Sequence, residues 1–259
     1  MDNKINLPLW ETISRSFMYI IKHCKDMCKI CSVFIVLWFL NIASGQPMLC
    51  STAQKECLMQ GAPLVYAVVL YLACAIITVN VIRSIILRQA CHWFHLYLGK
   101  PHFRFVGYNI VLALMVIIPS AFILMIVRST NDSELSNVTL AFLGAAFICT
   151  LIGLSVLCCR LYLVYGGAAI GDRNMTLAKS YMLTQGNMLK ICIGHIVLAF
   201  PTIILTYVAS RIYFSVSSSD ISQSLFSLWL LLCYFFESSI KGSYYSHLYQ
   251  YFDYMSRKK

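Results

Sequence analysis

Few side chains in this sequence combine a reactive type with a spacing that suggests chemistry. Glu237 and Lys241 are four residues apart, so on a helix they share one face and can form an ion pair. Such a carboxylate can bind a proton or a lipid headgroup, or it can serve only as a structural ion pair. His195 can relay protons near neutral pH, and its alternative role is a hydrogen bond to a neighbouring helix. The candidate ion-pair or headgroup site comprises Arg83, Arg160, Lys190, His195, Glu237 and Lys241.

The twelve cysteines indicate structural roles more than metal binding. Neither of the two clusters of cysteine and histidine, in residues 24–31 and 91–95, supplies four ligands at the spacing of a zinc site. Cys50 and Cys57 differ from the others because both fall in one short polar loop, six residues apart. If that loop meets an oxidising compartment, these two cysteines are a candidate disulfide.

Motifs for catalysis are absent from the sequence. It contains no nucleotide-binding loop, no zinc-protease or serine-hydrolase motif, and no pair of carboxylates placed for acid–base catalysis. We therefore expect no enzymatic activity and no cofactor.

The elements that must position these residues are apolar and long. Hydrophobic residues make up 59% of the 259 residues, and charged residues only 12%, with a mean hydropathy of +0.74. A soluble domain carries about 25% charged residues, and a helix needs roughly 20 apolar residues to cross a bilayer. The pattern predicts an all-α, polytopic membrane protein with one domain over residues 1–259. The predicted spans are residues 31–47, 62–83, 105–127, 137–160, 189–211 and 221–241.

Positive charge alternates between the loops that join these spans. The loops and termini on one side hold 17 of the 20 Lys and Arg residues, and the other side holds Lys55, Arg128 and Arg211. By the positive-inside rule both termini lie in the cytoplasm, and the net charge of +10 is mostly a signal of topology. Nucleic-acid binding is disfavoured because no soluble basic domain exists. Residues 30–45 also resemble a signal peptide, but we expect this first span to be retained.

Three inner segments have an amphipathic or aromatic pattern and are expected to form interfacial helices over residues 8–25, 84–99 and 176–186. In the first, apolar residues recur at helical spacing, with Trp10 and Tyr19 placed for the headgroup layer. The alternative is a cytosolic helix that packs on the spans. In the third, Thr176 is a plausible N-cap, and Gly186 and Asn187 provide a turn into the next helix.

The segment from Arg160 to Asn187 resembles a bacterial family pattern. Its letters run RLYL, then AA, then LAKSY and LTQGN, and a second stretch reads HLYLGKPHFRF at residues 95–105. This is similar to the membrane-domain family named after glycerophosphodiester phosphodiesterase, which is distantly related to Yip-type proteins, in its alphaproteobacterial form. The chain departs from the family at Lys100, Tyr181 and Gln185. The resemblance implies a multi-span bacterial inner-membrane protein without phosphodiesterase activity, because that chemistry resides in a separate soluble domain.

Three functional classes follow from these features. The first is a non-enzymatic protein that organises or binds anionic inner-leaflet lipids or a partner protein, including a second copy of the chain. The second is a transporter of small molecules or lipids, or a transporter subunit, with a polar inner-leaflet site around Glu237. The third, a lipid-modifying enzyme, has the least support. The basic, aromatic inner segments favour the first class, since each juxtamembrane base contributes about 1 kcal/mol toward anionic lipid.

Overall fold

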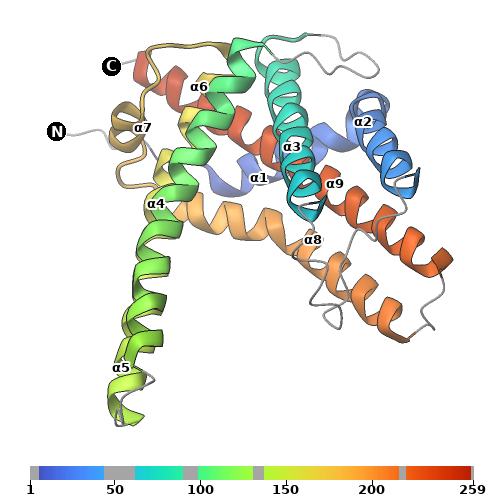
Figure 1. Cartoon of the computed structure of the whole chain (residues 1–259). Coiled ribbons are helices and arrows are strands. Elements are labelled where there is room, and N and C mark those ends of the chain that lie inside the picture. Colours follow the sequence, from blue (N-terminus) through green and yellow to red (C-terminus); the bar gives the residue numbers. More distant parts are fainter. Residues whose placement is uncertain (1–5, 44–61, 90–98, 131–136, 216–219, 258–259) are drawn as a thin grey trace.

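The computed structural model describes residues 6–43, 62–89, 99–130, 137–215 and 220–257, and all regular structure in these ranges is helical (Figure 1). The helices are α1 (Leu9–Lys22), α2 (Cys24–Ala43), α3 (Ala62–Ile86), α4 (Lys100–Thr130), α5 (Asn137–Leu161), α6 (Leu163–Ile170), α7 (Leu177–Leu183), α8 (Met188–Ser215) and α9 (Asp220–Arg257). The predicted all-α class is confirmed for this part of the chain.

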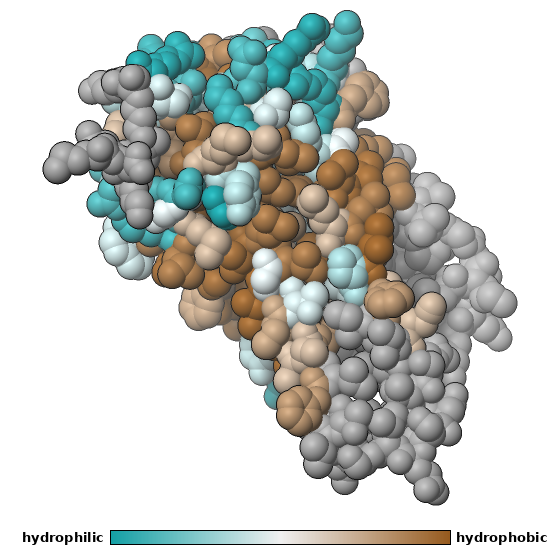
Figure 2. Space-filling view, turned by 90° about the vertical axis from the view of Figure 1, so that its left-hand side faces the viewer, coloured by the Kyte–Doolittle hydropathy of each residue, from teal (hydrophilic) through white to brown (hydrophobic). Residues whose placement is uncertain are grey.

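Four of these helices are long and apolar enough to cross a membrane. They contain the candidate spans Val68–Ile86, Lys100–Phe122, Gly144–Ile170 and Met188–Ile212, each with a mean hydropathy of 2.1 or 2.2. Large apolar side chains on them are exposed, as expected of helices that contact lipid. Figure 2 shows this apolar surface in the middle of the molecule and polar residues gathered at one end. These features suggest a membrane protein.

The long helix α9 lies at the centre of the fold and packs against α3, α8 and α1. It runs antiparallel to α8, because Trp229 Nε1 donates to Leu205 O at 3.3 Å while Tyr244 Oη donates to Ile191 O at 3.2 Å. The predicted span at 221–241 is therefore part of a much longer helix, which continues to Arg257.

Small side chains allow α9 to approach α3 closely. Ser238, Ser239, Gly242, Ser243 and Ser246 are buried on α9. Thr78 Oγ1 on α3 donates to Cys74 O at 2.9 Å and to Ser238 O at 3.3 Å. A Cβ atom at Gly242 would lie 2.9 Å from Thr78 O. This is the small-residue packing that membrane helices use, because burial from lipid gives no hydrophobic gain.

The α4–α5 hairpin extends away from the rest of the molecule (Figure 1). Among the described side chains of α4, the buried ones are His102, Phe105 and Leu112, all in its first half, and those of α5 are Cys158, Cys159 and Leu161 in its last turn. The described side chains in the outer halves of both helices are exposed or half-buried, while the inner ends anchor the hairpin.

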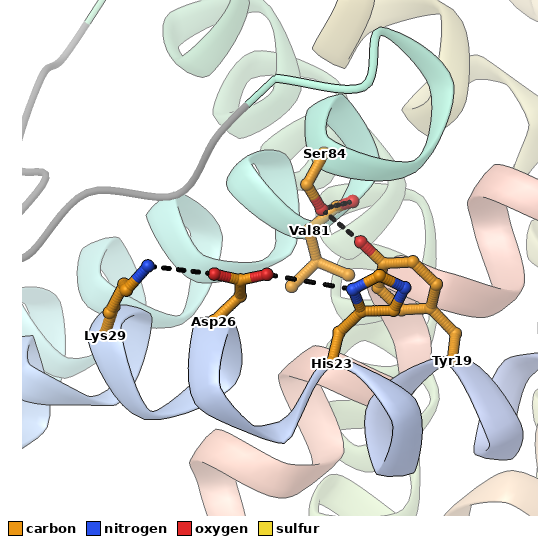
Figure 3. Close-up of polar contacts among 6 residues, drawn as sticks. All are labelled: Tyr19, His23, Asp26, Lys29, Val81 and Ser84. Atoms are coloured by element: carbon orange, nitrogen blue, oxygen red, sulfur yellow. Dashed lines mark hydrogen bonds and ion pairs between the residues drawn. The ribbon is translucent and has the colours of Figure 1, made fainter.

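The inner segments differ from the sequence predictions in two places. The helix predicted over 8–25 ends at Lys22, and a new helix begins at Cys24, seven residues before the predicted first span. At the break, Tyr19 stacks on His23 with ring centroids 4.4 Å apart and bonds Ser84 of α3, while Asp26 lies 3.7 Å from His23 (Figure 3). These contacts fix the direction in which α2 leaves α1.

The helix predicted over 84–99 is wrong at its start. Helix α3 ends at Ile86, and Arg88 has a left-handed backbone with a φ of 53°. The guanidinium of Arg83 then reaches Gln89 Oε1 at 3.0 Å, which folds the chain back over the last turn of α3. The remainder of that prediction, residues 90–98, lies outside the described residues, as do Cys50 and Cys57.

The N-cap of α7 and the glycine turn after it follow the sequence prediction, but the helix predicted over 176–186 ends at Leu183. Thr176 is the N-cap, and its Oγ1 accepts from Lys179 N at 3.2 Å. Gly186 has a φ of 82°, a conformation that glycine adopts at no steric cost. Asn187 directly precedes α8 and accepts the first helical bond from Ile191 N at 3.0 Å.

Candidate functional site

The six predicted site residues do not form one site. Glu237 and Lys241 form an ion pair on α9, with side chains 28% and 32% exposed. Lys241 is thus the partner of Glu237, and Arg160 contacts Tyr181 on α7 instead. Lys190 bonds Asn6 Oδ1 and donates to Leu7 O at 3.1 Å, so it holds the N-terminal segment on α8.

Arg160 engages α7. Its guanidinium carbon lies 3.4 Å from the ring centroid of Tyr181, and one terminal nitrogen donates to Tyr181 O at 2.7 Å. The main-chain oxygen of Arg160 in turn accepts from Ser180 Oγ at 2.8 Å and from Thr184 Oγ1 at 3.2 Å. The end of α5 and helix α7 are therefore locked together around one arginine.

Arg83 and Arg104 converge on the turn between α6 and α7. Arg83 donates to Ala169 O at 3.1 Å, and Arg104 donates to Asp172 O at 3.5 Å. The carboxylate of Asp172 accepts from Tyr249 Oη and from Asn174 N, each at 2.8 Å. Burial alone would raise the pKa of Asp172, but these hydrogen bonds and the charges of Lys179 and Arg104 outweigh it and lower the pKa.

We name Arg83, Arg104, Arg160 and Lys179 the basic rim. In the described part of the chain, carboxylates pair with Arg15, Lys29, Lys241, Arg257 and, at longer range, His23. No salt bridge within the described residues involves the basic rim. Its three arginines donate to main-chain oxygens, so most of the positive charge of the rim is left uncompensated and can attract anions.

A cavity of about 660 Å³ lies between α4, α5 and α8. Its floor is aromatic: the ring of Tyr162 lies 4.9 Å from His195, 5.6 Å from Tyr165 and 5.2 Å from Tyr245. The lining residues are Asn109, Leu112, Ala113, Val116, Leu151, Ile152, Ser155, Val156, Cys158, Cys159, Tyr162, Tyr165, Cys192, His195 and Ile196.

Several polar side chains that line this cavity can form hydrogen bonds, but no Lys, Arg, Asp or Glu side chain lines it. Tyr165 Oη donates to Asn109 Oδ1 at 2.6 Å, which leaves the amide NH₂ of Asn109 as a donor. His195 Nδ1 is buried without a hydrogen-bond partner among the described residues. Of the predicted site residues, His195 alone belongs to this cavity.

Sequence reasoning treated these residues one at a time and missed their convergence. His195 was expected to relay protons or to bond a neighbouring helix, and the cysteines were expected to have structural roles. A signal existed, because Cys158, Tyr162 and Tyr165 recur at i, i+4 and i+7 and so share a helical face. Nothing in the sequence placed that face opposite His195.

A smaller cavity of about 300 Å³ lies between α1 and the C-terminal part of α9, lined by Pro8, Glu11, Thr12, Arg15, His247, Gln250, Tyr251 and Tyr254. His247 Nε2 is buried there without a hydrogen-bond partner among the described residues. Burial, followed by the charge of Arg15, lowers the pKa of His247. The residue is therefore neutral at physiological pH.

The described residues hold no group of three or more His, Cys, Asp or Glu side chains placed to bind a metal ion. No protein-family model, curated protein or solved structure matches this chain. The functional class must therefore come from the basic rim, the ion pair and the two cavities.

Proposed function

We propose that this chain is a non-enzymatic integral membrane protein that binds anionic lipid headgroups at its basic rim. The observation that carries the proposal is the pairing pattern of its cations. Arg83, Arg104 and Lys179 of the basic rim lie near the turn between α6 and α7, and Arg160 contacts Tyr181 on α7. One carboxylate, Asp172, lies in that turn, so the four cations outnumber it. Guanidinium groups left without carboxylates at the end of membrane helices suit phosphate oxygens.

We also propose six spans, in which α2 and the first half of α9 join the four candidate helices. For α9 the support is its antiparallel contact with α8, which brings Trp229 beside Leu205, inside the Met188–Ile212 candidate span. The charge asymmetry supports cytoplasmic termini, and the family resemblance supports a bacterial inner membrane. A reporter fused to the C-terminus, active only in the cytoplasm, tests this orientation. Membership of the glycerophosphodiester phosphodiesterase membrane-domain family stays a prediction.

In this arrangement α1 lies along the inner membrane surface. Its Thr12, Ile13, Ser16 and Ile20 are buried, and the helix packs on α8 and α9, as the cytosolic alternative expected. The opposite side exposes 69% of Trp10 and 66% of Ile21, together with Met18. Such large apolar side chains, on a helix that also carries Arg15 and Lys22, support contact with the headgroup layer.

Lipid binding is tested on the purified full chain by native mass spectrometry with phosphatidylglycerol and phosphatidylcholine of identical acyl chains. We expect preferential retention of phosphatidylglycerol. The double variant Arg83→Gln/Arg104→Gln removes two juxtamembrane charges, which at about 1 kcal/mol each corresponds to a loss of roughly 30-fold in affinity.

The matched control is Arg15→Gln/Arg257→Gln. It removes the same two charges from the chain, but both arginines are exposed and paired with Glu11 and Asp253. We expect this control to change phosphatidylglycerol affinity by less than about threefold, since exposed pairs contribute little. Equal losses in the two double variants would show that net charge alone attracts the lipid, and the basic rim would then have no specific role.

A second candidate function, transport of a small molecule or lipid, is favoured by the Glu237–Lys241 pair. It lies half-buried on α9, away from the ends of the helix. If Glu237 carries protons or substrate, Glu237→Gln abolishes flux into liposomes, while Asp253→Asn, which neutralises the other i, i+4 pair of α9, leaves flux intact. Unchanged flux in Glu237→Gln would leave the pair a structural role only.

A further inference from the structure

The cavity between α4, α5 and α8 is the strongest unassigned feature of the molecule. Its volume of about 660 Å³ falls within the range of small-molecule sites, which is roughly 300–1,000 Å³. It does not include any residue of the basic rim, so its occupant and the headgroups bound at the rim are independent questions.

The cavity opens sideways between two membrane helices. Leu112, Cys158 and Cys159 form its buried inner wall. Ile152 on α5 and Ile196 on α8 line its mouth and are 59% and 64% exposed. All five residues lie in candidate spans, so the mouth faces the hydrocarbon layer and a ligand enters from the bilayer.

The side chains that line the cavity disfavour a charged ligand. A charged ligand in this position would lack a counter-ion, because no Lys, Arg, Asp or Glu lines the cavity. Removing a charge from water without a partner costs several kcal/mol, which neutral groups avoid.

Neutral hydrogen-bonding groups instead come from three helices. Asn109 on α4 retains its NH₂ donor, and His195 on α8 has an unpartnered Nδ1. Ser155 on α5 brings a hydroxyl to the same cavity. A ligand with a hydroxyl and a carbonyl could satisfy these donors and acceptors, and the apolar remainder of the wall suits an acyl chain.

We propose that this cavity binds a neutral glycerolipid of the diacylglycerol class, with its free hydroxyl and ester carbonyl at Asn109, Ser155 and His195. The acyl chains leave through the mouth between Ile152 and Ile196 into the bilayer. This site is separate from the anionic headgroup site at the basic rim, and each can fail without the other.

The test uses the purified full chain and 1,2-dioleoylglycerol, with dioleoylphosphatidylglycerol as a charged probe that has the same acyl chains. Native mass spectrometry should show one dioleoylglycerol bound per chain. Ala113 lines the cavity, so Ala113→Phe should lower dioleoylglycerol affinity by at least about tenfold. Phosphatidylglycerol retention at the basic rim should be unchanged by this variant, which separates the two sites.

The matched control is Ala145→Phe, which adds the same bulk to an exposed position of α5 that does not line the cavity. It should bind dioleoylglycerol as the parent chain does. Ile196→Trp is a second filling variant, at the mouth, in case Ala113→Phe does not fold. Ser155→Ala should weaken dioleoylglycerol binding without changing the affinity for 3-deoxy-1,2-dioleoylglycerol, which keeps both oleoyl esters and lacks the hydroxyl.

Three results would overturn the proposal. Equal affinities for dioleoylglycerol in Ala113→Phe and Ala145→Phe would mean that the lipid binds the outer surface without selectivity. Displacement of dioleoylglycerol by dioleoylphosphatidylglycerol at equal concentration would show that the site does not select neutral lipid. A homodimer that Ala113→Phe dissociates would identify a second copy of the chain as the occupant.

Discussion

Close packing of α3 against α9 at Gly242 can be tested with a single methyl group. In Gly242→Ala, the new Cβ would lie 2.9 Å from Thr78 O, 3.1 Å from Val81 Cβ and 3.2 Å from Val81 Cγ1. All three contacts are tighter than ordinary van der Waals contact, and the closest is to a main-chain atom that cannot rotate away. The two helices must therefore separate by a few tenths of an ångström, which disturbs the bond from Thr78 Oγ1 to Ser238 O.

The expected change in the free energy of unfolding follows from two opposing effects. Replacing a helical glycine by alanine stabilises the helix by about 0.8–1.0 kcal/mol, whereas overpacking a close interface costs about 1–3 kcal/mol. Gly153 in α5 supplies the matched control, because a Cβ there meets nothing within 4 Å. Gly153→Ala should therefore show the gain alone, and the free energies of unfolding of the two variants should differ by about 1–3 kcal/mol in favour of Gly153→Ala.

The assay is reversible unfolding of the purified protein in mixed micelles of increasing SDS fraction, followed by tryptophan fluorescence and circular dichroism. Gly242→Val provides a second point and should be less stable than Gly242→Ala, because its extra methyl groups meet Val81. If Gly242→Ala and Gly153→Ala were equally stable, α3 and α9 would not approach each other as closely as the structure shows, and the small-residue account of the core would be wrong.

The remaining predictions concern three contacts outside the candidate spans. The pKa of His247 is lowered in the folded protein, so below the ordinary value of 6.5 the unfolded chain takes up a proton that the folded chain does not. The free energy of unfolding should therefore fall as the pH drops below about 6.5. His247→Gln should flatten this dependence in urea unfolding curves recorded at several pH values. Asn187 Oδ1 accepts from Leu7 N at 2.8 Å, so Asn187→Leu should speed proteolytic cleavage near Leu7, whereas Asn187→Asp, which keeps the acceptor, should not. Thr176→Ala removes the N-cap of α7 and should lower stability by about 1 kcal/mol, with Thr176→Ser near the parent value in the same unfolding assay.

The sequence predicted most helices well because a hydropathy pattern depends directly on the length and composition of each apolar segment. The predicted spans at 105–127, 137–160 and 189–211 each fall within one observed helix, apart from small differences at the ends. The turn around Thr176 and Gly186 was also predictable, since both residues act through local backbone geometry. Helix ends that depend on distant contacts were not, as at Lys22 and Ile86, where side chains of α3 and a folded-back Gln89 decide the break.

The site was less predictable because charged residues can be identified in a sequence, whereas the burial of each side chain cannot. The sequence analysis placed Arg83, Arg160 and Glu237 in one candidate site, but each contacts a different neighbour in the structure. The cavity brings together Asn109 and His195, which are 86 residues apart in the sequence. Their proximity follows from how α4 and α8 meet α5, and a hydropathy pattern carries no information on which helices are neighbours.

The way the fold sorts its polar groups argues for lipid binding over ion transport. A transported ion needs charged or carbonyl ligands along its path, because a bare charge in hydrocarbon is costly. Here the one carboxylate of α9 near the spans, Glu237, already has Lys241 as its partner, and the cavity that opens to the bilayer offers neutral groups alone. The uncompensated cations instead lie at the helix ends, where anionic headgroups are found. The cations at the helix ends match the headgroup layer, and the neutral hydrogen-bonding groups of the cavity match the hydrocarbon layer. A protein that transported ions would instead need charged or carbonyl ligands within the spans.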